Sequence, residues 1–593
     1  MIPVSTKWQE AIREQFRYQG YLRIIIQVTP PGLQENLQVD TPDTDTVATT
    51  EVLESDAGVE VTPFVTLERN RWLLNGKFKL LPKDQIVDDW WSTPLKDQAK
   101  VLTFTFDRTY SIPGIYVGWD ASTGTFPSNL LIEGYGAEGT KLYTYEVTDI
   151  SSATGFVDAS MDNVHKVVLT IKQWNVDGWR ARIHEILFGL YASYDSINNG
   201  RIVEGESYDY AHPLCESLPQ HTFTVSLRNL DGEFDPSLKQ GISKYLSRRQ
   251  LVQYQWGFAT AYGEVEWSPM LNYYVDEFSI PEDSKEVSLS STSRLALMTT
   301  ELKNLDYDAS DRTLYDVATL ILQRSGVITE SEQETPWKLS EKLKEYTTNA
   351  PIPVKAANVL LQLLTCATPL WLFTDPQTGY VCIDELPETP VQVVGKTQEL
   401  GDPGVTVQET LHTVSFVVYN YFKASEKSEI ASGQYEVTGE QTINITYSCD
   451  YAVGVTCEVQ GATLVKFTPY SSSAVVQLKA TGTAQVTVSL TGYEVKSSST
   501  TIETYRNNSI TFGLDVQIDT PFLTNTKKLT ELSDWVVGWY NKPQKLSIPY
   551  IGYPELTAGD GIDLTTLYDQ HNVQVLGNKI EFNGGFEGTL EVR

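Results

Sequence analysis

The sequence predicts a mainly β, multi-domain protein. Its 593 residues correspond to about four domains of roughly 150 residues each. Apolar residues make up 41% of the chain and include 13 Trp, 32 Tyr and 20 Phe, which is enough for several hydrophobic cores and too many for a disordered chain. Short segments of alternating apolar and polar residues recur between Gly, Pro, Asn and Asp, as strands do in sandwiches and barrels.

The chain is strongly acidic. It carries 45 Lys+Arg against 76 Asp+Glu, a formal net charge of −31. This balance argues against a protein that wraps or reads nucleic acid, because phosphate neutralisation needs clustered Lys and Arg. It also argues against binding to an anionic membrane surface. The sequence contains no run of 18 apolar residues that could span a bilayer, and its N-terminal stretch lacks the apolar core of a secretory signal. We therefore expect no membrane insertion.

Residues 1–30 are predicted to form an N-terminal helix and a first strand. Trp8, Ile12 and Phe16 lie four residues apart, which places them on one face of an amphipathic helix. The β-branched run at residues 22–28 predicts the strand.

Residues 31–67 are predicted to be an acidic linker or loop. Between Ile24 and Leu67 there are eight acidic residues and no Lys or Arg. Low hydrophobicity with charge of one sign is typical of a solvated connection between folded units.

Residues 68–190 are predicted to form one β-domain. Its predicted strands are 101–106, 129–135, 166–171 and 178–189. With the turn at 137–140, this order resembles galactose-binding-like (discoidin-type) jelly rolls. The resemblance implies a domain that either binds glycans or serves as a structural spacer.

Trp174 and Trp179 are the candidate glycan or partner contacts of this domain. They flank the turn at 175–178, where exposed indole rings would stack on a sugar face. Packing of both rings in the sandwich core, or against the next domain, is the alternative that we favour.

Residues 191–300 return to strands, and residues 301–390 are predicted to form an α+β unit. Within the first, 218–229 alternates apolar and polar residues and predicts a half-buried strand. The Asp-, Gly- and Pro-rich run at 230–236 that follows predicts a turn.

Two helices and a hairpin are predicted in the α+β unit. Asp311 is predicted to cap the first helix, which ends at Gly326, and the second helix spans 354–366. The hairpin spans 370–383. The helix residues predicted to be buried are Leu314, Val317, Ala318 and Ile321 in the first and Ala357, Leu360, Leu361 and Leu364 in the second.

The remaining segments are predicted to be β. Residues 391–437 are expected to return to strands of the main body. Residues 438–502 are rich in Ser and Thr and predict a small Ig-like sandwich with evenly spaced short strands, among them 443–447, 474–478 and 484–490.

Residues 503–593 are predicted to form a C-terminal β-domain. Gly559-Asp560-Gly561 predicts a tight turn, and Asn583-Gly584-Gly585 predicts a hairpin.

The five cysteines are predicted to be free, buried thiols of a protein made in a reducing cytoplasm. They are odd in number and form no C-x-x-C motif, so zinc and redox sites are disfavoured. A pair between Cys449 and Cys457 on neighbouring strands is the alternative.

No catalytic motif is present, and we expect neither an enzyme nor a cofactor or metal site. None of the six histidines forms an i, i+4 pair on a helix, and no G-x-S-x-G, Walker-type or G-x-G-x-x-G motif occurs in its context. Residues 231–235 lack the spacing of a calcium loop. A pair of carboxylates meeting across a cleft stays open, because sequence does not show such pairs.

Several runs in the segments 1–30, 191–437 and 503–593 carry a family resemblance. In chain order they are Leu218-Pro219 with the strand ending at Asn229, Asp231–Pro236, Tyr245-Leu246 before Arg248-Arg249-Gln250, Thr313–Ala318, Asp375 with Gly379, Gly552–Ile562 and Phe582–Leu590. In this order they resemble the tail hub and tail-associated baseplate proteins of bacteriophages.

The resemblance implies packed hub-like β-barrel domains and an α+β unit, interrupted by the jelly roll and the Ig-like sandwich and assembled as a homotrimer. In the family this ring closes the distal end of the tail tube, anchors receptor-binding or lytic parts, and opens for DNA passage. The implied partners are the tail tube or distal tail protein, the tape measure protein, and receptor-binding or fibre proteins. The implied location is the virion tail tip, after synthesis in the host cytoplasm.

Two further expectations follow from the resemblance. The chain stops at Arg593 without a fibre or lytic domain, so these functions are expected from other chains. DNA is expected to pass without specific binding, along a lumen dominated by acidic side chains, because like charge prevents adhesion.

Two other function classes are weighed against the hub. The first alternative is a carbohydrate-binding adhesin that recognises host surface glycans through the jelly roll. The second is a glycan hydrolase, which the absence of a long βαβα block disfavours.

Overall fold

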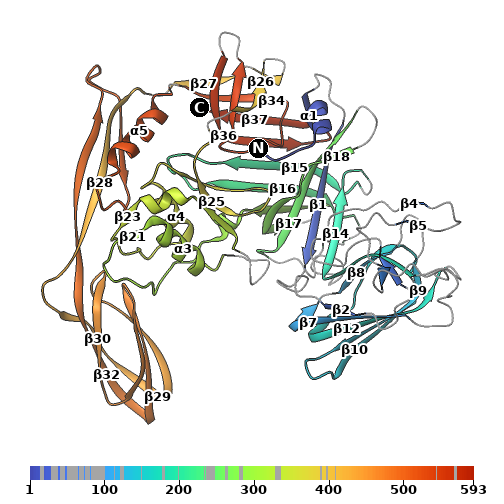
Figure 1. Ribbon diagram of the computed structural model, residues 1–593, viewed down its shortest axis with the longest axis horizontal. Coiled ribbons are helices and arrows are strands. Elements are labelled where there is room, and N and C mark those ends of the chain that lie inside the picture. The colour runs from blue at the N-terminus through green and yellow to red at the C-terminus, as the bar shows by residue number, and fades with distance from the viewer. Residues whose placement is uncertain are drawn as a thin grey trace.

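A computed structural model gives the structure of the chain. It describes all residues except 14–18, 29–37, 41–46, 50–63, 66–71, 74–79, 82–99, 113, 120–125, 149, 176–180, 198–199, 231, 233, 235–247, 261–264, 280–284, 328–334, 388–389, 396–397, 402, 408, 543 and 566–569. The described chain is mainly β and multi-domain, as predicted, with a central body and two β-units that extend from it (Figure 1).

The body is one 14-stranded sheet assembled from four separate segments of the chain. Its main strand order is β14-β1-β17-β19-β20-β16-β15-β36-β37-β34-β27, with β18, β26 and β35 as side branches. The strands are β1 (Gly20–Val28), β14 (Leu190–Asp195), β15 (Ile202–Tyr210), β16 (Gln220–Arg228), β17 (Leu251–Ala259), β18 (Val265–Trp267), β19 (Leu271–Ser279), β20 (Glu286–Thr292), β26 (Pro390–Val394), β27 (Gly404–Val407), β34 (Gln544–Tyr550), β35 (Gly561–Thr565), β36 (Gln570–Phe582) and β37 (Phe586–Val592).

Alternation along the strands builds the core of the body. In β16, Phe223, Val225 and Leu227 are buried while the residues between them are partly exposed, which confirms the predicted half-buried strand. Phe223 stacks on Tyr254 of β17 with ring centroids 3.8 Å apart. Full burial of one such aromatic side chain contributes about 1.5–3 kcal/mol.

The N-terminal helix seals one side of this core. Helix α1 (Thr6–Arg13) buries Trp8 and Ile12, and the Trp8 ring meets Phe258 of β17 edge-on at 6.1 Å. The predicted helix is therefore present up to Arg13. Phe16 lies outside the described residues.

The pairing of β15 with β36 joins the middle of the chain to its C-terminal segment. The two strands are antiparallel, with Gly205 opposite Phe582 and Tyr210 opposite Gly577. The β36–β37 hairpin turns at Gly584, whose φ of +78° favours glycine, so the predicted C-terminal hairpin is confirmed. This pairing makes residues about 370 positions apart part of one core.

The first extending unit is a sandwich of two five-stranded sheets, drawn at the lower right of Figure 1. One sheet has the order β10-β9-β12-β7-β2 and the other β11-β8-β13-β3-β6. The strands are β2 (Gln38–Asp40), β3 (Val47–Thr49), β6 (Leu80–Leu81), β7 (Lys100–Ile112), β8 (Ile115–Trp119), β9 (Pro127–Tyr135), β10 (Lys141–Val147), β11 (Thr154–Val157), β12 (Met161–Trp174) and β13 (Ala181–Phe188); the separate pair β4 (Phe64–Val65) and β5 (Trp72–Leu73) completes the segment.

The segment predicted as a linker contributes strands to this sandwich. β2 pairs antiparallel with β7, and β3 pairs parallel with β13. Both strands are three residues long and contain Val, which favours a strand. β2 is the edge strand of its sheet, and β3 lies between β13 and β6. The acidic stretch 31–67 therefore contributes short strands to both sheets of the sandwich.

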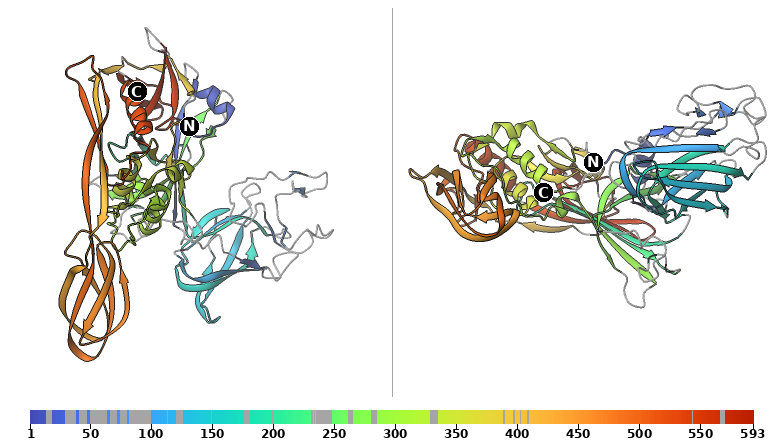
Figure 2. Two further views of the ribbon diagram at one scale, coloured as in Figure 1. Left: turned by 60° about the vertical axis from the view of Figure 1, so that its left-hand side comes forward. Right: turned by 90° about the horizontal axis from the view of Figure 1, so that it is seen from below.

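The α+β unit packs beside the body, as the two views of Figure 2 also show. Its elements are α2 (Arg294–Leu297), β21 (Arg312–Thr313), α3 (Leu314–Arg324), β22 (Trp337–Leu339), η4 (Glu341–Glu345), β23 (Thr347–Thr348), α4 (Ala357–Thr365), β24 (Trp371–Thr374) and β25 (Val381–Asp384). The eight helix residues predicted to be buried are buried, and the predicted hairpin is the antiparallel pair β24–β25.

The predicted cap of the first helix is wrong. The N-cap of α3 is Thr313, whose hydroxyl accepts a hydrogen bond from the Asp316 amide, while Asp311 lies before the helix. Arg312 and Thr313 pair with β23, so the chain is held extended up to the residue before the helix and only Thr313 has the cap position. The C-terminal end near Gly326, with φ +63°, is as predicted.

The second extending unit hangs from a long ribbon at the left of Figure 1. The elements of ribbon and unit are β28 (Leu411–Lys423), β29 (Ser428–Thr446), β30 (Ala452–Gln460), β31 (Thr463–Pro469), β32 (Ser473–Arg506), β33 (Leu514–Asp519) and α5 (Leu529–Tyr540). Buried residues between Ile430 and Leu490 form a separate hydrophobic core. We call the segment that contains this core, residues 425–493, the distal unit.

The prediction of separate strands at 474–478 and 484–490 is wrong. Both belong to β32, a single strand of 34 residues. Gly482 and Gly439 have positive φ, and the pairing of β32 with β29 shifts register between Thr438 and Glu440. A bulge therefore bends two paired strands where the sequence pattern indicates a turn.

Among the helices of the described residues, none combines the length and the hydropathy needed to cross a membrane.

We predict that the distal unit can be excised without loss of the body. Lys423 and Val495 are register partners at the neck of the ribbon, so replacing residues 425–493 by Asn-Gly closes the β28–β32 hairpin with a tight turn. The main loss is contact at Leu305, whose carbonyl accepts from Ser471 N at 2.9 Å, and we expect a cost of at most about 2 kcal/mol. Thermal unfolding followed by circular dichroism measures this, and an insoluble or non-cooperative product would contradict it.

Candidate functional site

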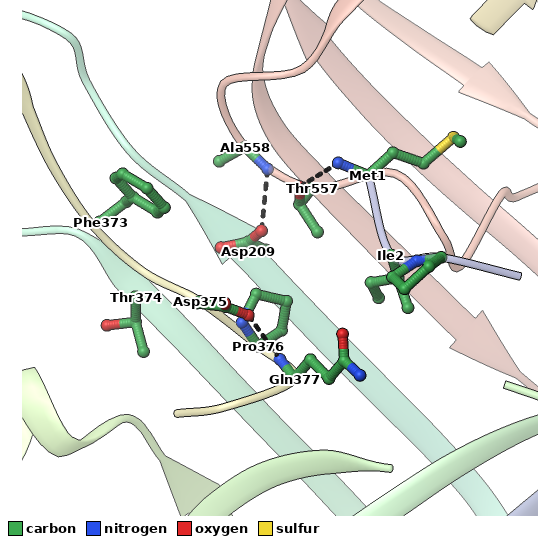
Figure 3. Close-up of a pocket in the computed structure, with 11 residues that line it drawn as sticks. Met1, Ile2, Asp209, Phe373, Thr374, Asp375, Pro376, Gln377, Thr557 and Ala558 are labelled. Carbon is green, nitrogen blue, oxygen red and sulfur yellow. Dashed lines mark hydrogen bonds between the residues drawn. The ribbon is translucent and has the colours of Figure 1, made fainter. Parts of the chain in front are cut away.

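The site that holds the molecule together is a joint between the body and the α+β unit. It is a cavity of about 210 Å³ where four parts of the chain meet. The N-terminal residues, the end of β15, the β24–β25 hairpin and the turn at 557–558 line it (Figure 3). We call this region the joint.

Carboxylates at the joint accept hydrogen bonds from backbone amides. Asp209 Oδ2 accepts a hydrogen bond from Ala558 N at 2.8 Å, and Asp560 Oδ2 accepts from Thr557 N at 2.8 Å (Figure 3 draws the first). Asp560 Oδ1 lies 2.5 Å from the Met1 nitrogen. These carboxylates therefore fix the turn after β34 against β15 and the N-terminal segment.

The β24–β25 hairpin reaches the body through aromatic packing. Trp371 stacks on Phe373 with centroids 4.3 Å apart, and a Cβ on Gly559 would lie 1.8 Å from the Trp371 ring. Gly559 also has a φ of +90°. Only glycine satisfies both the backbone conformation and the contact with the indole.

Hydrogen bonds reinforce this contact on both sides. Asn272 N of β19 donates to Pro376 O at 2.8 Å, and Asn272 Nδ2 donates to Gln377 O at 2.8 Å. Gln574 Nε2 of β36 donates to Pro387 O at 2.8 Å and to Gly559 O at 3.0 Å. The α+β unit is thus tied to two strands that lie apart in the order of the body sheet.

A second polar cluster lies where α5 meets the C-terminal strand. Arg593 Cζ lies 5.2 Å from the Trp539 ring centroid and 5.1 Å from that of Tyr540, and Arg593 Nε donates to Lys542 O at 3.3 Å. The pKa of the Arg593 guanidinium is lowered by burial. The pKa of Lys542 is also lowered, first by burial and then by Arg593.

His212 belongs to the same cluster. Its ring meets Trp539 edge-on at 5.8 Å, and its Nε2 lies 3.6 Å from Glu216 Oε2. Burial lowers the pKa of His212, and the Glu216 carboxylate opposes this shift. Tyr540 donates its hydroxyl to Glu216, so this carboxylate already has a partner.

Two further histidines lie beside carboxylates elsewhere in the described residues. Over this part of the chain, no three His, Cys, Asp or Glu side chains gather as metal ligands. His221 stacks on Tyr273 at 4.3 Å with Asp209 Oδ1 3.4 Å away, and His412 Nδ1 lies 2.9 Å from Asp515. His221 therefore packs on an aromatic ring, and His412 is hydrogen-bonded to a carboxylate.

The structure describes one of the two tryptophans that are predicted as glycan or partner contacts. Trp174 is 3% exposed and meets Trp119 edge-on at 5.7 Å in the sandwich core, so it presents no ring face to a ligand. Trp179 lies outside the described residues.

All five cysteines are free thiols. Cys215 and Cys382 are buried, whereas Cys366, Cys449 and Cys457 are partly exposed. Cys366 Sγ lies 3.8 Å from the Cys215 carbonyl oxygen, which brings the C-terminal end of α4 against the segment after β15.

The sequence predictions include the turn at 559–561 but not the joint. Trp371 and Phe373 appear there only as hairpin residues, and Asp209 carries no motif. The available signal was the glycine pair around Asp560, which indicates a turn and does not show what packs on it.

Comparisons with known proteins give structural neighbours only. No family model and no curated protein matches the chain. The solved structures that it resembles include tail and baseplate proteins. A tail protein from Neisseria meningitidis has a TM-score of 0.36 and 9% identity, covering 66% of this chain and 94% of that one.

Two more neighbours are of the same kind. The 43 kDa tail protein of a Shewanella oneidensis prophage has a TM-score of 0.35 and 9% identity, covering 68% of this chain and 94% of that one. A chain of the phage P2 baseplate in its activated conformation has a TM-score of 0.21 and 8% identity, covering 70% and 92%.

We predict that Gly559→Ala destabilises the chain much more than Gly584→Ala. Both positions have positive φ, which costs an alanine about 1–2 kcal/mol. A Cβ at 584 meets nothing within 4 Å, whereas at 559 it strikes Trp371, which adds about 1–3 kcal/mol for overpacking. Urea unfolding of both variants measures the difference, and equal midpoints would show that the Trp371 contact is not tight.

We predict that His212 makes the protein less stable in mild acid. Its pKa is lower in the folded than in the unfolded chain, so the unfolded chain binds the proton more readily. The free energy of unfolding should therefore fall as the pH drops through the ordinary histidine value of about 6.5 towards the folded pKa.

The test compares variants across this range. In His212→Gln the loss of stability between about pH 7.5 and 5.5 should be smaller than in the wild type. His165→Gln, which removes a histidine from a half-buried position of β12, is the control for the substitution itself. Urea midpoints at each pH report it, and an unchanged slope in His212→Gln would contradict the prediction.

Proposed function

We propose that this chain is a structural protein of a bacteriophage tail tip. In this role it is a hub that forms a homotrimeric ring, closes the tail tube, anchors receptor-binding or lytic parts, and opens for DNA passage. It acts as a scaffold and carries out no catalysis.

One observation carries the proposal: three of the runs that carry the family resemblance come together in the body. The strand 220–228 is β16, the run 582–590 is the β36–β37 hairpin, and both belong to the body sheet. The run 552–562 packs its buried Tyr553, Leu556 and Ile562 in the same core. Segments far apart in sequence therefore form one unit, as expected of a common hub.

Two further runs belong to the α+β unit, whereas the runs 231–236 and 245–250 lie largely outside the described residues. The run 313–318 opens α3, and Asp375 with Gly379 shapes the hairpin loop. A Cβ on Gly379 would lie 3.3 Å from Asn272 Cβ of β19, so the loop sits directly on the sheet. The order of runs in the sequence thus corresponds to one connected scaffold.

The two extending units suit a scaffold that holds other parts. Each has its own hydrophobic core. The sandwich leaves the body sheet between the paired strands β1 and β14, and the distal unit leaves the separate six-stranded sheet between the paired strands β28 and β32. In the proposed hub they project from the ring, where the tail tube or distal tail protein, the tape measure protein and fibre proteins are the expected neighbours.

The charge of −31 fits the passage of DNA. An acidic lumen repels phosphate and lets DNA slide without holding it. The proposal therefore includes a ring lumen dominated by Asp and Glu. The adhesin alternative draws no support from Trp174, because that ring is buried.

The experiment is localisation on particles. Antibodies against the purified chain, labelled with gold, should mark one end of the tail, distal to the capsid, on virus particles released by the bacterium that carries this gene. Antibody absorbed beforehand with the purified chain is the control. Label on the capsid or along the tail, or particles that carry none of this chain, would refute the tail-tip assignment.

A further inference from the structure

Two thiols lie together where α4 meets the segment that follows β15. Cys366 is the C-cap residue of α4, and its Sγ lies 3.7 Å from the Leu214 carbonyl oxygen and 3.8 Å from that of Cys215. The side chains of Cys215 and Cys366 are hydrogen-bonded to each other. The fold therefore brings into contact two cysteines that are 151 residues apart in the sequence.

Neighbouring contacts hold this pair in place. Gln362, one turn before Cys366 on α4, donates from Nε2 to the Cys215 carbonyl oxygen at 2.7 Å. On the other side, Cys215 N donates to His212 O at 2.8 Å. Cys215 has a φ of +52°, a conformation that residues with a Cβ rarely adopt. The helix end and the segment are thus fixed against each other at the two thiols.

The two thiols differ in exposure and in acidity. Cys366 is partly exposed, whereas Cys215 is buried. The hydrogen bond from Cys215 lowers the pKa of Cys366, and the same hydrogen bond together with burial raises the pKa of Cys215. Burial raises the pKa of the other three thiols, those of Cys382, Cys449 and Cys457. An accessible thiol of lowered pKa beside a second thiol is the arrangement found in redox-active pairs, because the thiolate is the reactive form.

We propose that Cys215 and Cys366 are an oxidation site, which forms an intramolecular disulfide when the chain meets a small disulfide such as oxidised glutathione. The Cys366 thiolate attacks one sulfur of the oxidant and releases one glutathione. The Cys215 thiol then loses its proton and attacks Cys366 Sγ, which releases the second glutathione. In total, two protein thiols lose two protons and two electrons, and the oxidant takes them up as two glutathione thiols.

The disulfide ties the α+β unit to the body. Cys215 lies in the connection between β15 and β16, which are both body strands. In the same connection, Ala211 N donates to Leu576 O of β36 at 2.9 Å, and Ala211 packs with Trp371 of the β24–β25 hairpin. The new bond therefore adds a covalent link beside the joint. The inference does not depend on the hub function, because it concerns only groups within one chain.

The first test counts thiols and maps the link. The purified chain is equilibrated with oxidised glutathione, alkylated with N-ethylmaleimide in denaturant and digested for mass spectrometry. The reduced chain should carry five alkyl groups and the oxidised chain two fewer, with Cys215 and Cys366 joined in one pair of peptides. Five alkyl groups after oxidation, or a link between Cys449 and Cys457 in place of this one, would overturn the proposal.

The second test uses serine variants to separate the two steps. Cys215→Ser lacks the second thiol, so it should retain one glutathionyl group on Cys366. In Cys366→Ser, the buried Cys215 should gain none. Cys457→Ser removes a partly exposed thiol of the distal unit, and as the matched control it should form the same link as the wild type. A glutathionyl group on Cys215 in Cys366→Ser would contradict the assignment of Cys366 as the attacking thiol.

The third test measures the restraint on the α+β unit. The linked wild type should unfold at a temperature about 5 °C higher than the same chain in reductant, because the link closes a loop of about 150 residues in the unfolded chain. Cys366→Ser should have one midpoint under both conditions, which controls for effects of the reductant. A linked wild type with an unchanged midpoint would show that the disulfide does not restrain the unit.

Discussion

The structure depends on the antiparallel pairing of β15 with β36. These strands are about 370 residues apart, so bringing them together carries a large entropic cost that only a shared core repays. Leu22 of β1 contributes to this shared core, because its side chain fills the space left by Gly205 on β15. Without this pairing, β36, β37, β34 and β27 would have no partner among the other described strands of the body sheet's main path.

The insertions are compatible with this constraint because each begins and ends at neighbouring points on two paired strands. Val28 and Leu190, which flank the sandwich, are register partners on β1 and β14 of the body sheet. Lys423 and Val495, which flank the distal unit, are register partners on β28 and β32 of the separate six-stranded sheet. Each insertion is therefore equivalent to a long hairpin loop. Because loop-closure entropy grows only slowly with length, a self-supporting unit can occupy such a loop at small cost.

Local patterns made much of this architecture predictable. The alternation in β16, the helix faces around Leu314 and Leu360, and the glycine hairpin at 584 are set by neighbours in sequence, and they appear as expected. The cap of α3 could not be predicted so directly, because Asp311 and Thr313 are both residue types that cap helices. The pairing of Arg312 and Thr313 with β23 decides that Thr313 stands at the helix start. The single strand β32 and the joint escaped prediction for a related reason. Glycine occurs both in bulges and in turns, so it did not distinguish the two in β32. Trp371, which packs on Gly559, lies almost 190 residues earlier in the sequence.

The centre of the body is fixed by close contacts, whereas β27 at one end of the body sheet is exposed. At the centre, buried carboxylates such as Asp560 are paired with backbone amides, and glycine permits contacts that no other residue allows, so the α+β unit has one position on the sheet. At the ends of the sheet, β27 is neutral, β-branched and uncovered, which would be an aggregation hazard in a protein without strong charge. Here the excess of acidic residues repels copies that approach at random. The high net charge therefore offsets the aggregation hazard of an exposed neutral strand.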